Sequence, residues 1–386
     1  MPAEITLLLT ISLIIWASPF VSKIVRIPTP PVEIVLGSVL ALFGFIGHHE
    51  YFDIIAEVGF LYLMFLAGME VDLKQIISSP KELIRKAIIF ILALGAMAIA
   101  SGMVFDFHII VTISLPLISI GILASLSKSY SKDEEWIRIA FIVGVLGEIA
   151  SITALTIIDA ASNVGFGLEL FTKLGYLFLF IFAIYLVYRI LHLLFWWYPE
   201  LKNTLMPKID TADQDVRLSI ALFFILISLM LALDLELALG TFIAGVAISA
   251  FFHHEKRLEE KMSSLGFGFL VPLFFIHVGA SFDLHALARP SVVTGALLIT
   301  AVMLTMRILA GFYLKKISGS RNALLIAFAL SMPLTLLIAV ATIGYTANII
   351  DLNIYYQLIL ASLFEVIIAM VAIKIIRNVK VTELVE

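Results

Sequence analysis

Long uninterrupted apolar runs are the feature that most constrains this chain. The stretch ITLLLTISLIIWASPFV near the N-terminus carries no charge and no alternation of polar and apolar positions. A helix that crosses a bilayer needs about 20 such residues, whereas the strands of a membrane barrel alternate in polarity. The runs therefore predict an all-α polytopic membrane protein.

Composition excludes a soluble fold. Of the 386 residues, 62% are hydrophobic and 14% are charged, whereas soluble domains have roughly 45–50% and 25%. The chain contains no cysteine, which excludes disulfides and cysteine metal sites. It also has no soluble basic segment, so nucleic acid is not an expected partner. The apolar N-terminus is interpreted as a first span, not as a removed signal peptide.

Charged and Gly/Pro-rich segments divide the apolar runs into thirteen predicted spanning helices. Boundaries derived in this way are good to about two to four residues. The predicted ranges are 4–22, 31–47, 54–70, 84–105, 108–127, 136–160, 168–195, 214–233, 238–252, 264–281, 290–315, 321–346 and 354–377.

Basic residues gather in every second loop, which fixes an orientation. Loops rich in Lys and Arg stay in the cytoplasm. The alternation predicts an N-terminus outside and a C-terminus in the cytoplasm of a plasma (inner) membrane, with Lys173 and Arg289 as exceptions. The residues that carry the alternation are Lys23, Arg26, Lys74, Lys81, Arg85, Lys86, Lys128, Lys132, Arg138, Lys202, Lys208, Arg217, Lys256, Arg257, Lys261, Lys315, Lys316, Arg321, Arg377 and Lys380.

The two halves of the chain contain related motifs. The segment SLPL at 114–117 reappears as SMPL at 331–334, and the same offset of 217 residues takes Glu148 to Glu365. Spans one to six thus correspond to spans eight to thirteen. A shift by seven spans reverses the direction of insertion, so the pattern predicts inverted six-helix repeats. Such repeats are typical of secondary transporters.

A proline occurs at the same place in each repeat. Pro116 lies in the fifth span and Pro333 in the twelfth. Each proline removes a helical hydrogen bond, so both spans are predicted to break. Freed carbonyls and helix ends at such breaks can face an ion site.

Glu148 is the leading candidate site residue. Charged groups inside a membrane are costly and usually mark ion pathways. Away from water, a carboxylate is stabilised by a proton or by a small monovalent cation. One group that binds either species, never both, is sufficient for antiport. Nearby oxygens are expected from Ser151, Ser119 and Thr335, and the alternative is a glutamate paired to a neighbouring helix for packing.

Three further ionisable residues inside predicted spans are candidates for a role. Arg307 stays protonated, so it is expected to pair with a buried anion, or alternatively to reach the membrane surface near the end of its span. Glu365 is the expected partner, and direct ion binding by Glu365 is the alternative. His277 is expected to be a hydrogen-bonded packing residue rather than a pH sensor.

Several stretches resemble a known family. IPTPPVEIVLG, EVGFLYLMFLAGMEVDL, ELALGTFIAGVAIS and GFGFLVPLFFIHVGASFDL resemble the second monovalent cation:proton antiporter family, which includes Kef-type proteins and bacterial sodium/proton exchangers. The resemblance implies thirteen spans, a homodimer and a core domain that moves against a scaffold. It also implies that broken helices five and twelve cross beside a carboxylate of helix six.

The resemblance also suggests a division of the chain. Residues 1–378 would form one transporter unit, followed by a short cytoplasmic tail at 379–386. The scaffold would comprise helices of about 1–70 and 214–281, the core those of 84–160 and 290–377, and helix 168–195 would link them. The expected partners are a second copy, the bilayer and a separate regulatory subunit.

The chain departs from the family pattern in two places. Members carry Asp-Asp or Gln-Asp in the sixth span, whereas this chain has Gly147-Glu148. Glu148 therefore takes the second, essential position, and the first side chain is missing. The twelfth-span glutamate of some members is missing together with its fifth-span basic partner. Because the resemblance implies that the first sixth-span acid can pair with a basic residue such as Arg307, and this acid is absent, Glu365 is expected to be the replacement anion beside Arg307.

Together these features predict a secondary active antiporter. It would exchange Na⁺ or K⁺ for H⁺ by alternating access, one for one, with no cofactor. A proton-independent cation efflux channel of Kef type is the alternative, and another solute carrier on the same fold is a second. An enzyme is not expected, because no Walker-A motif or metal-ligand spacing is present.

Overall fold

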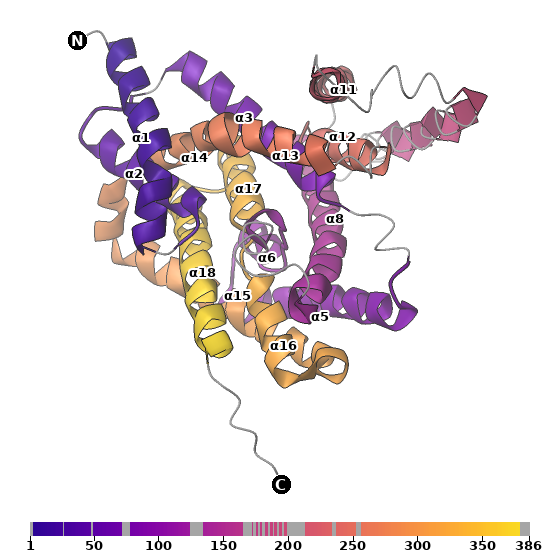
Figure 1. Cartoon of the computed structure of the whole chain (residues 1–386). Coiled ribbons are helices and arrows are strands. Elements are labelled where there is room, and N and C mark those ends of the chain that lie inside the picture. The colour runs from indigo at the N-terminus through magenta and orange to yellow at the C-terminus, as the bar shows by residue number, and fades with distance from the viewer. Residues whose placement is uncertain are drawn as a thin grey trace. The chain divides into compact units, whose positions relative to one another are not determined.

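The computed structural model describes residues 3–25, 27–47, 49–71, 78–123, 134–164, 213–233, 237–251 and 256–378, together with single positions between 172 and 198. Regular structure in these residues is entirely helical (Figure 1). The main helices are α1 (Ala3–Val25), α2 (Thr29–Leu42), α3 (Glu50–Met69), α5 (Lys81–Phe105), α6 (Ile109–Ser114), α8 (Glu135–Val164), α11 (Gln214–Ala232), α12 (Leu237–Phe251), α13 (Lys256–Leu265), α14 (Val271–Ala280), α15 (Pro290–Gly311), α16 (Lys315–Ala329), α17 (Leu334–Thr346) and α18 (Leu352–Asn378). Short helical turns complete them: η1 (Gly266–Leu270), η2 (Leu284–Ala288) and η3 (Phe312–Leu314).

The helices are long and apolar enough to cross a bilayer. Within the described residues, eight stretches meet this condition. One of them, Pro290–Thr346, is 57 residues long and includes α15, α16 and α17. The protein is therefore an all-helical membrane protein, as its sequence predicts. The predicted span 168–195 lies outside the continuously described residues, so the count of thirteen stays a prediction.

The helices form two compact units. The first comprises residues 1–47, 74–152 and 278–386, and the second comprises 48–73 and 153–277. The first unit holds both proline-containing breaks and every other residue predicted to belong to the ion site. The predicted division into scaffold and core concerns motion, and it stays a prediction.

Both predicted helix breaks are present. Helix α6 ends at Ser114, and the next six residues, 115–120, are not helical. Helix α16 ends at Ala329, and α17 begins at Leu334, directly after Pro333. The predicted spans 108–127 and 321–346 are thus each interrupted at the proline, where the backbone cannot continue its hydrogen-bond ladder.

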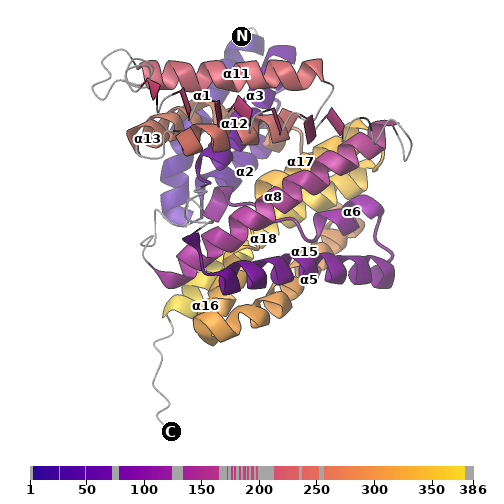
Figure 2. The same cartoon turned by 90° about the vertical axis from the view of Figure 1, so that its right-hand side faces the viewer.

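The two breaks lie close together inside the first unit. Helices α6 and α17 are neighbours, and α15 packs along α18 (Figure 1). Figure 2 looks onto α8, with α6 and α17 beside it. Helix α8, which corresponds to the predicted span 136–160, thus lies where the two interrupted helices meet.

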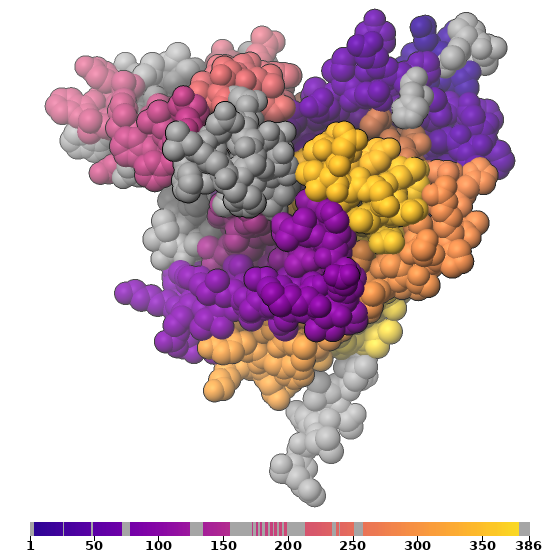
Figure 3. Space-filling model, turned by 180° about the vertical axis from the view of Figure 1, so that it is seen from behind, coloured from indigo at the N-terminus to yellow at the C-terminus, as the bar shows by residue number. Residues whose placement is uncertain are grey.

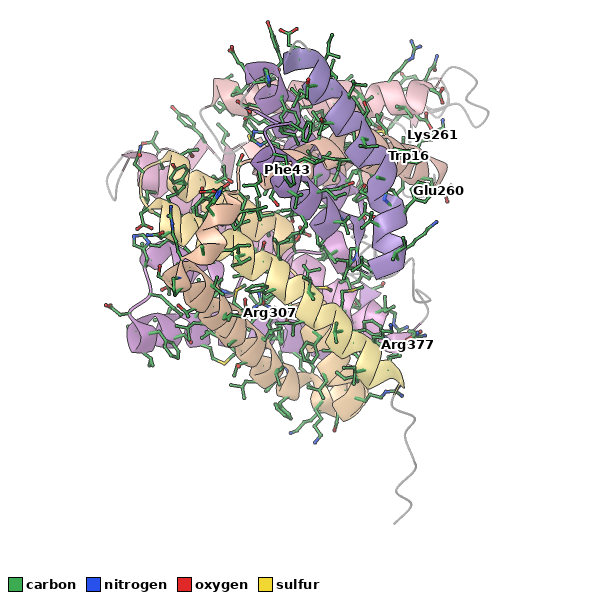
Figure 4. All side chains as sticks on the ribbon, turned by 90° about the vertical axis from the view of Figure 1, so that its left-hand side faces the viewer. Trp16, Phe43, Glu260, Lys261, Arg307 and Arg377 are labelled. Carbon is green, nitrogen blue, oxygen red and sulfur yellow. The ribbon has the colours of Figure 1, made fainter. Side chains whose placement is uncertain are left out.

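Other helices present apolar side chains outward. Helix α5 lies at the surface in Figure 3 and exposes Leu92 and Met103. Helix α1 exposes Leu13 and Trp16, and Trp16 points away from the helices in Figure 4. In a bilayer such surfaces face lipid or another protein.

The second unit contains a close contact between backbones. Helix α3 packs on α12, and a β-carbon at Gly68 would overlap the carbonyl of Phe242. Likewise, a β-carbon at Gly245 would overlap the carbonyl of Phe65. Small residues permit this kind of approach between membrane helices. The glycines of the family-like stretches therefore set the packing of α3 on α12.

Candidate functional site

Glu148 lies at the first helix break. It is carried by α8, and its side chain is fully buried, with 0% exposure. Its Oε1 accepts a hydrogen bond from Ser119 Oγ at 3.2 Å, and its Oε2 accepts one from the backbone N–H of Ile120 at 3.4 Å. The break thus turns a hydroxyl and a backbone donor toward the carboxylate of a neighbouring helix.

The second break joins the same cluster through Thr335. Its Oγ1 lies 2.9 Å from Ser119 Oγ. Because Ser119 has one hydroxyl proton and donates it to Glu148, Thr335 donates to Ser119 in this arrangement. Three of the four predicted ion-site residues therefore form one buried chain of oxygens, Thr335 to Ser119 to Glu148.

Ser151, the fourth predicted residue, supports the break. Its Oγ donates to the carbonyl of Gly147 at 2.7 Å and accepts from the N–H of Ile118 at 2.9 Å. It therefore satisfies a backbone donor that the interrupted helix leaves unpaired. A role as a direct ion ligand stays a prediction.

Gly147 precedes Glu148 on α8, at the position where the sequence resemblance implies a further polar side chain. A β-carbon there would lie 2.5 Å from Cδ1 of Ile118. Such a separation is well inside van der Waals contact, so Ile118 would have to move. The side chain of Ile118 thus fills the space next to Gly147, which itself has no side chain.

Arg307 links the two breaks. It belongs to α15 and is also fully buried (Figure 4). Its guanidinium donates to the carbonyl of Leu117 in the first break and, at 3.0 Å, to that of Leu330 in the second. A third bond, of 3.1 Å, goes to Met303 in its own helix. The arginine thus satisfies carbonyls that each interruption releases, a task that needs several donors in one planar group.

Glu365 lies beside this arginine, as the sequence predicts. Its Oε1 is 3.5 Å from Nη1 of Arg307, and both side chains have 0% exposure. The carboxylate accepts no hydrogen bond from the described residues. The two groups therefore attract each other as charges without a close hydrogen bond.

Two further serines next to the breaks, and the histidine predicted to be a packing residue, have partners nearby. Ser114 Oγ donates to the carbonyl of Ile110, and Ser331 Oγ donates to that of Ala327. Both hydroxyls thus bond within their own helices. In the second unit, His277 Nε2 lies 2.8 Å from Asp53 Oδ1.

Sequence reasoning missed one buried carboxylate. Glu33, on α2, is 3% exposed. The sequence does indicate this residue, because an acid inside the predicted span 31–47 is a candidate for burial. Glu33 belongs to the stretch IPTPPVEIVLG, which supports the family resemblance, and the sequence pattern alone does not show that its side chain is buried.

A comparison with protein families identifies the chain. A model described as "Sodium/hydrogen exchanger, transmembrane" matches residues 8–378. The chain belongs to the sodium/hydrogen exchanger family. It is thus a member of a transporter family rather than an enzyme family, and a multi-pass membrane protein.

Two curated proteins are similar to this chain over most of its length. YjbQ of Bacillus subtilis, which carries the name of a Na⁺/H⁺ antiporter, is 26% identical over 370 residues, an alignment that covers 90% of this chain and 59% of YjbQ. The chain thus spans less than two thirds of the length of YjbQ. The Na⁺/H⁺ antiporter of Enterococcus hirae is 26% identical over 334 residues, which cover 83% of each protein.

A solved structure shares the fold. The sodium proton antiporter MjNhaP1 from Methanocaldococcus jannaschii, solved at pH 8, superposes with a TM-score of 0.68 and 14% identity. The match covers 97% of this chain and 99% of that one. At this identity the likeness concerns the fold.

The comparisons correct part of the sequence interpretation. The matches are to proteins named as Na⁺/H⁺ antiporters, and the assignment to the Kef-type, second antiporter family is not supported. Neither K⁺ as the cation nor the channel alternative gains support.

Proposed function

We propose that this exchanger is a Na⁺/H⁺ antiporter in which Glu148 binds Na⁺ and H⁺ in turn. The observation that carries the proposal is the position of the Glu148 carboxylate. It lies fully buried at two helix breaks, in contact with the hydroxyl chain formed by Ser119 and Thr335. Oxygen atoms are the ligands that hard cations prefer.

Competition for one carboxylate couples the two fluxes. A buried carboxylate without a positive partner is unfavourable. Glu148 has two hydrogen-bond donors and no ion pair with the described residues. Its charge is therefore best balanced by a bound cation or removed by a proton. Na⁺ and H⁺ displace each other from this carboxylate. Transport of one ion out of the cell therefore requires transport of the other ion in.

Burial of Glu148 also supports alternating access. A carboxylate with 0% exposure cannot exchange its ion with water unless the surrounding helices move. Movement toward one side and then the other would expose the same carboxylate to each solution in turn. Arg307 would preserve the local geometry during this movement, because it holds carbonyls of both breaks.

The single carboxylate supports electroneutral exchange. Ile118 fills the space next to Gly147, so this place has no second acid to carry an additional proton. One Na⁺ would then replace one H⁺, with no net movement of charge.

The membrane setting follows the charge pattern of the sequence. We propose a plasma-membrane protein with its N-terminus outside, its C-terminus in the cytoplasm and a second copy as partner. A separate regulatory subunit would fit the same proposal. The exchange needs no cofactor other than the transported ions.

Reconstitution of a Glu148→Gln variant tests the proposal. Glutamine keeps the size of the side chain but cannot alternate between the charged and neutral forms. In proteoliposomes with a pH gradient, addition of Na⁺ should dissipate the gradient for the wild type and leave it unchanged for the variant.

A matched control removes a different acid. Glu260 is exposed on α13 (Figure 4), so Glu260→Gln should exchange ions like the wild type. Persistent Na⁺-driven proton flux in folded Glu148→Gln protein would refute the assignment.

A further inference from the structure

Glu33 is a buried carboxyl group that the proposed exchange does not use. It lies on α2 and is 3% exposed, and its Oε1 is 3.1 Å from Oγ of Ser18 on α1. Ser18 is itself fully buried. Ser18 is the only hydrogen-bond partner of Glu33 among the described residues, so this acid depends on one hydroxyl.

The hydrogen bonds around Ser18 indicate which protonation state of Glu33 is compatible with the geometry. The Ser18 hydroxyl has one proton but two acceptors within reach, Oε1 of Glu33 at 3.1 Å and the carbonyl of Ile15 at 3.4 Å. If Glu33 is ionised, only one acceptor can receive that proton. If Glu33 is protonated, its O–H donates to Ser18 Oγ, and Ser18 donates to Ile15. Both contacts are then hydrogen bonds.

The charges near α2 do not balance an ionised Glu33. In the first unit α2 packs against α1 and η2, and Gly279 at the end of α14 contacts Ile34. On α1, Glu4 and Lys23 are exposed. Next to η2, Asp283 Oδ1 contacts His285 Nδ1 at 2.9 Å. Among the described residues, Glu33 forms no ion pair, so it lacks the partner that a buried charge requires.

Two backbones lie in close contact next to Glu33, and the carboxyl group has few oxygen neighbours. A β-carbon at Gly279 would overlap the carbonyl of Ile34, the residue that follows Glu33. A cation such as Na⁺ needs several oxygen ligands, whereas Glu33 has one hydroxyl neighbour. The proton is therefore the ligand that this place suits.

From this geometry we infer that Glu33 is a second proton-binding site, which holds its proton at neutral pH as a donor to Ser18 and releases it on alkalinisation. This inference goes beyond the proposed exchange, because Glu33 binds no Na⁺ in it. Release of the proton leaves a buried carboxylate with at most one donor, which weakens the contact of α1 with α2. Because glutamate in the unfolded chain is already ionised at neutral pH, the folded state binds one more proton than the unfolded state, so stability falls with rising pH from the acidic range until Glu33 releases its proton and does not fall further from this group above that pH.

Infrared spectroscopy of the full chain in lipid tests the site directly. A protonated carboxylic acid has a carbonyl band that a carboxylate lacks. At neutral pH, Glu33→Gln should lose intensity in this band relative to the wild type, whereas Glu4→Gln, which alters an exposed acid, should not. An unchanged band in Glu33→Gln would mean that Glu33 is ionised, and it would overturn the inference.

Two further measurements keep the test decisive. The melting temperature of the wild type should fall more steeply with rising pH than that of Glu33→Gln, and parallel curves would contradict the inference. If Glu33→Gln does not fold, Ser18→Ala should retain the band of Glu33 but shift its frequency, because the acceptor is gone. An unshifted band would overturn the hydrogen-bond assignment. These measurements read protonation and stability, so they stand whether or not Glu148 exchanges ions.

Discussion

Arg307 and Glu365 form an ion pair between α15 and α18, with 3.5 Å between Nη1 and Oε1 and no exposure of either side chain. The pair is asymmetric in its other contacts. Arg307 donates to carbonyls of both helix breaks, whereas Glu365 accepts no hydrogen bond from the described residues. Each member therefore responds differently to loss of the other.

Removal of the arginine should cost more than removal of the acid. Arg307→Gln leaves an uncompensated buried carboxylate and releases the carbonyls, and breaking a buried pair in this way costs about 3–5 kcal/mol. Glu365→Gln leaves Arg307 with its carbonyl acceptors, so the loss should be smaller. Thermal unfolding of both single variants and the double variant should show coupling of about 0.5–3 kcal/mol. Additive effects would show that the two residues act independently.

The hydroxyl chain should set the affinity for Na⁺. Ser119→Ala removes a hydroxyl oxygen next to the Glu148 carboxylate that is a proposed Na⁺ ligand, and polar contacts to charged groups contribute about 1.5–3 kcal/mol. The KM for Na⁺ should therefore rise roughly tenfold to a hundredfold. Ser114→Ala is the matched control, because that hydroxyl bonds within its own helix. Equal KM values for the two variants would exclude Ser119 as a ligand.

Competition at Glu148 should appear in the pH dependence of Na⁺ binding. Protons occupy the carboxylate more as the pH falls, so the apparent KM for Na⁺ should rise on the acidic side. When protonation is nearly complete, each pH unit should change it about tenfold, since one proton competes with one cation. Initial rates over a range of Na⁺ concentrations measure this effect. A KM independent of pH would indicate separate sites for the two ions.

Exchange should be insensitive to membrane potential. One net charge moved across 100 mV corresponds to about 2.3 kcal/mol, or roughly a fiftyfold change in the equilibrium ion ratio. For one-for-one exchange, a potential clamped with a K⁺ ionophore should leave the final Na⁺ and pH gradients unchanged. Final gradients that change with the clamped potential would contradict one-for-one exchange, and with it the argument that Gly147 and Ile118 leave no place for a second acid.

Some of the site could be predicted because it depends on local chemistry. Pro116 and Pro333 interrupt their helices wherever these pack, and an acid such as Glu148 in an apolar span needs oxygen neighbours. Glu365 was predicted to lie beside Arg307 because each charge needs an opposite one, and the structure has this pair.

The remaining contacts depend on three-dimensional packing. No spacing in the sequence indicates that Arg307 donates to the carbonyls of Leu117 and Leu330, because backbone acceptors carry no residue signature. The contact of Ile118 with Gly147 likewise depends on how the break turns. Ser114 and Ser331 also lie next to the breaks, yet their hydroxyls bond within their own helices and not to Glu148.

Glu148 and Glu365 stand 217 residues apart at matching places in the two halves of the chain, yet one meets hydroxyls and the other a guanidinium. The same acid at matching places therefore has different surroundings in the two halves. Among the described residues, Glu148 has no cationic side chain beside it, whereas Glu365 has Arg307. The neighbouring residues, and not the acid itself, distinguish the two positions.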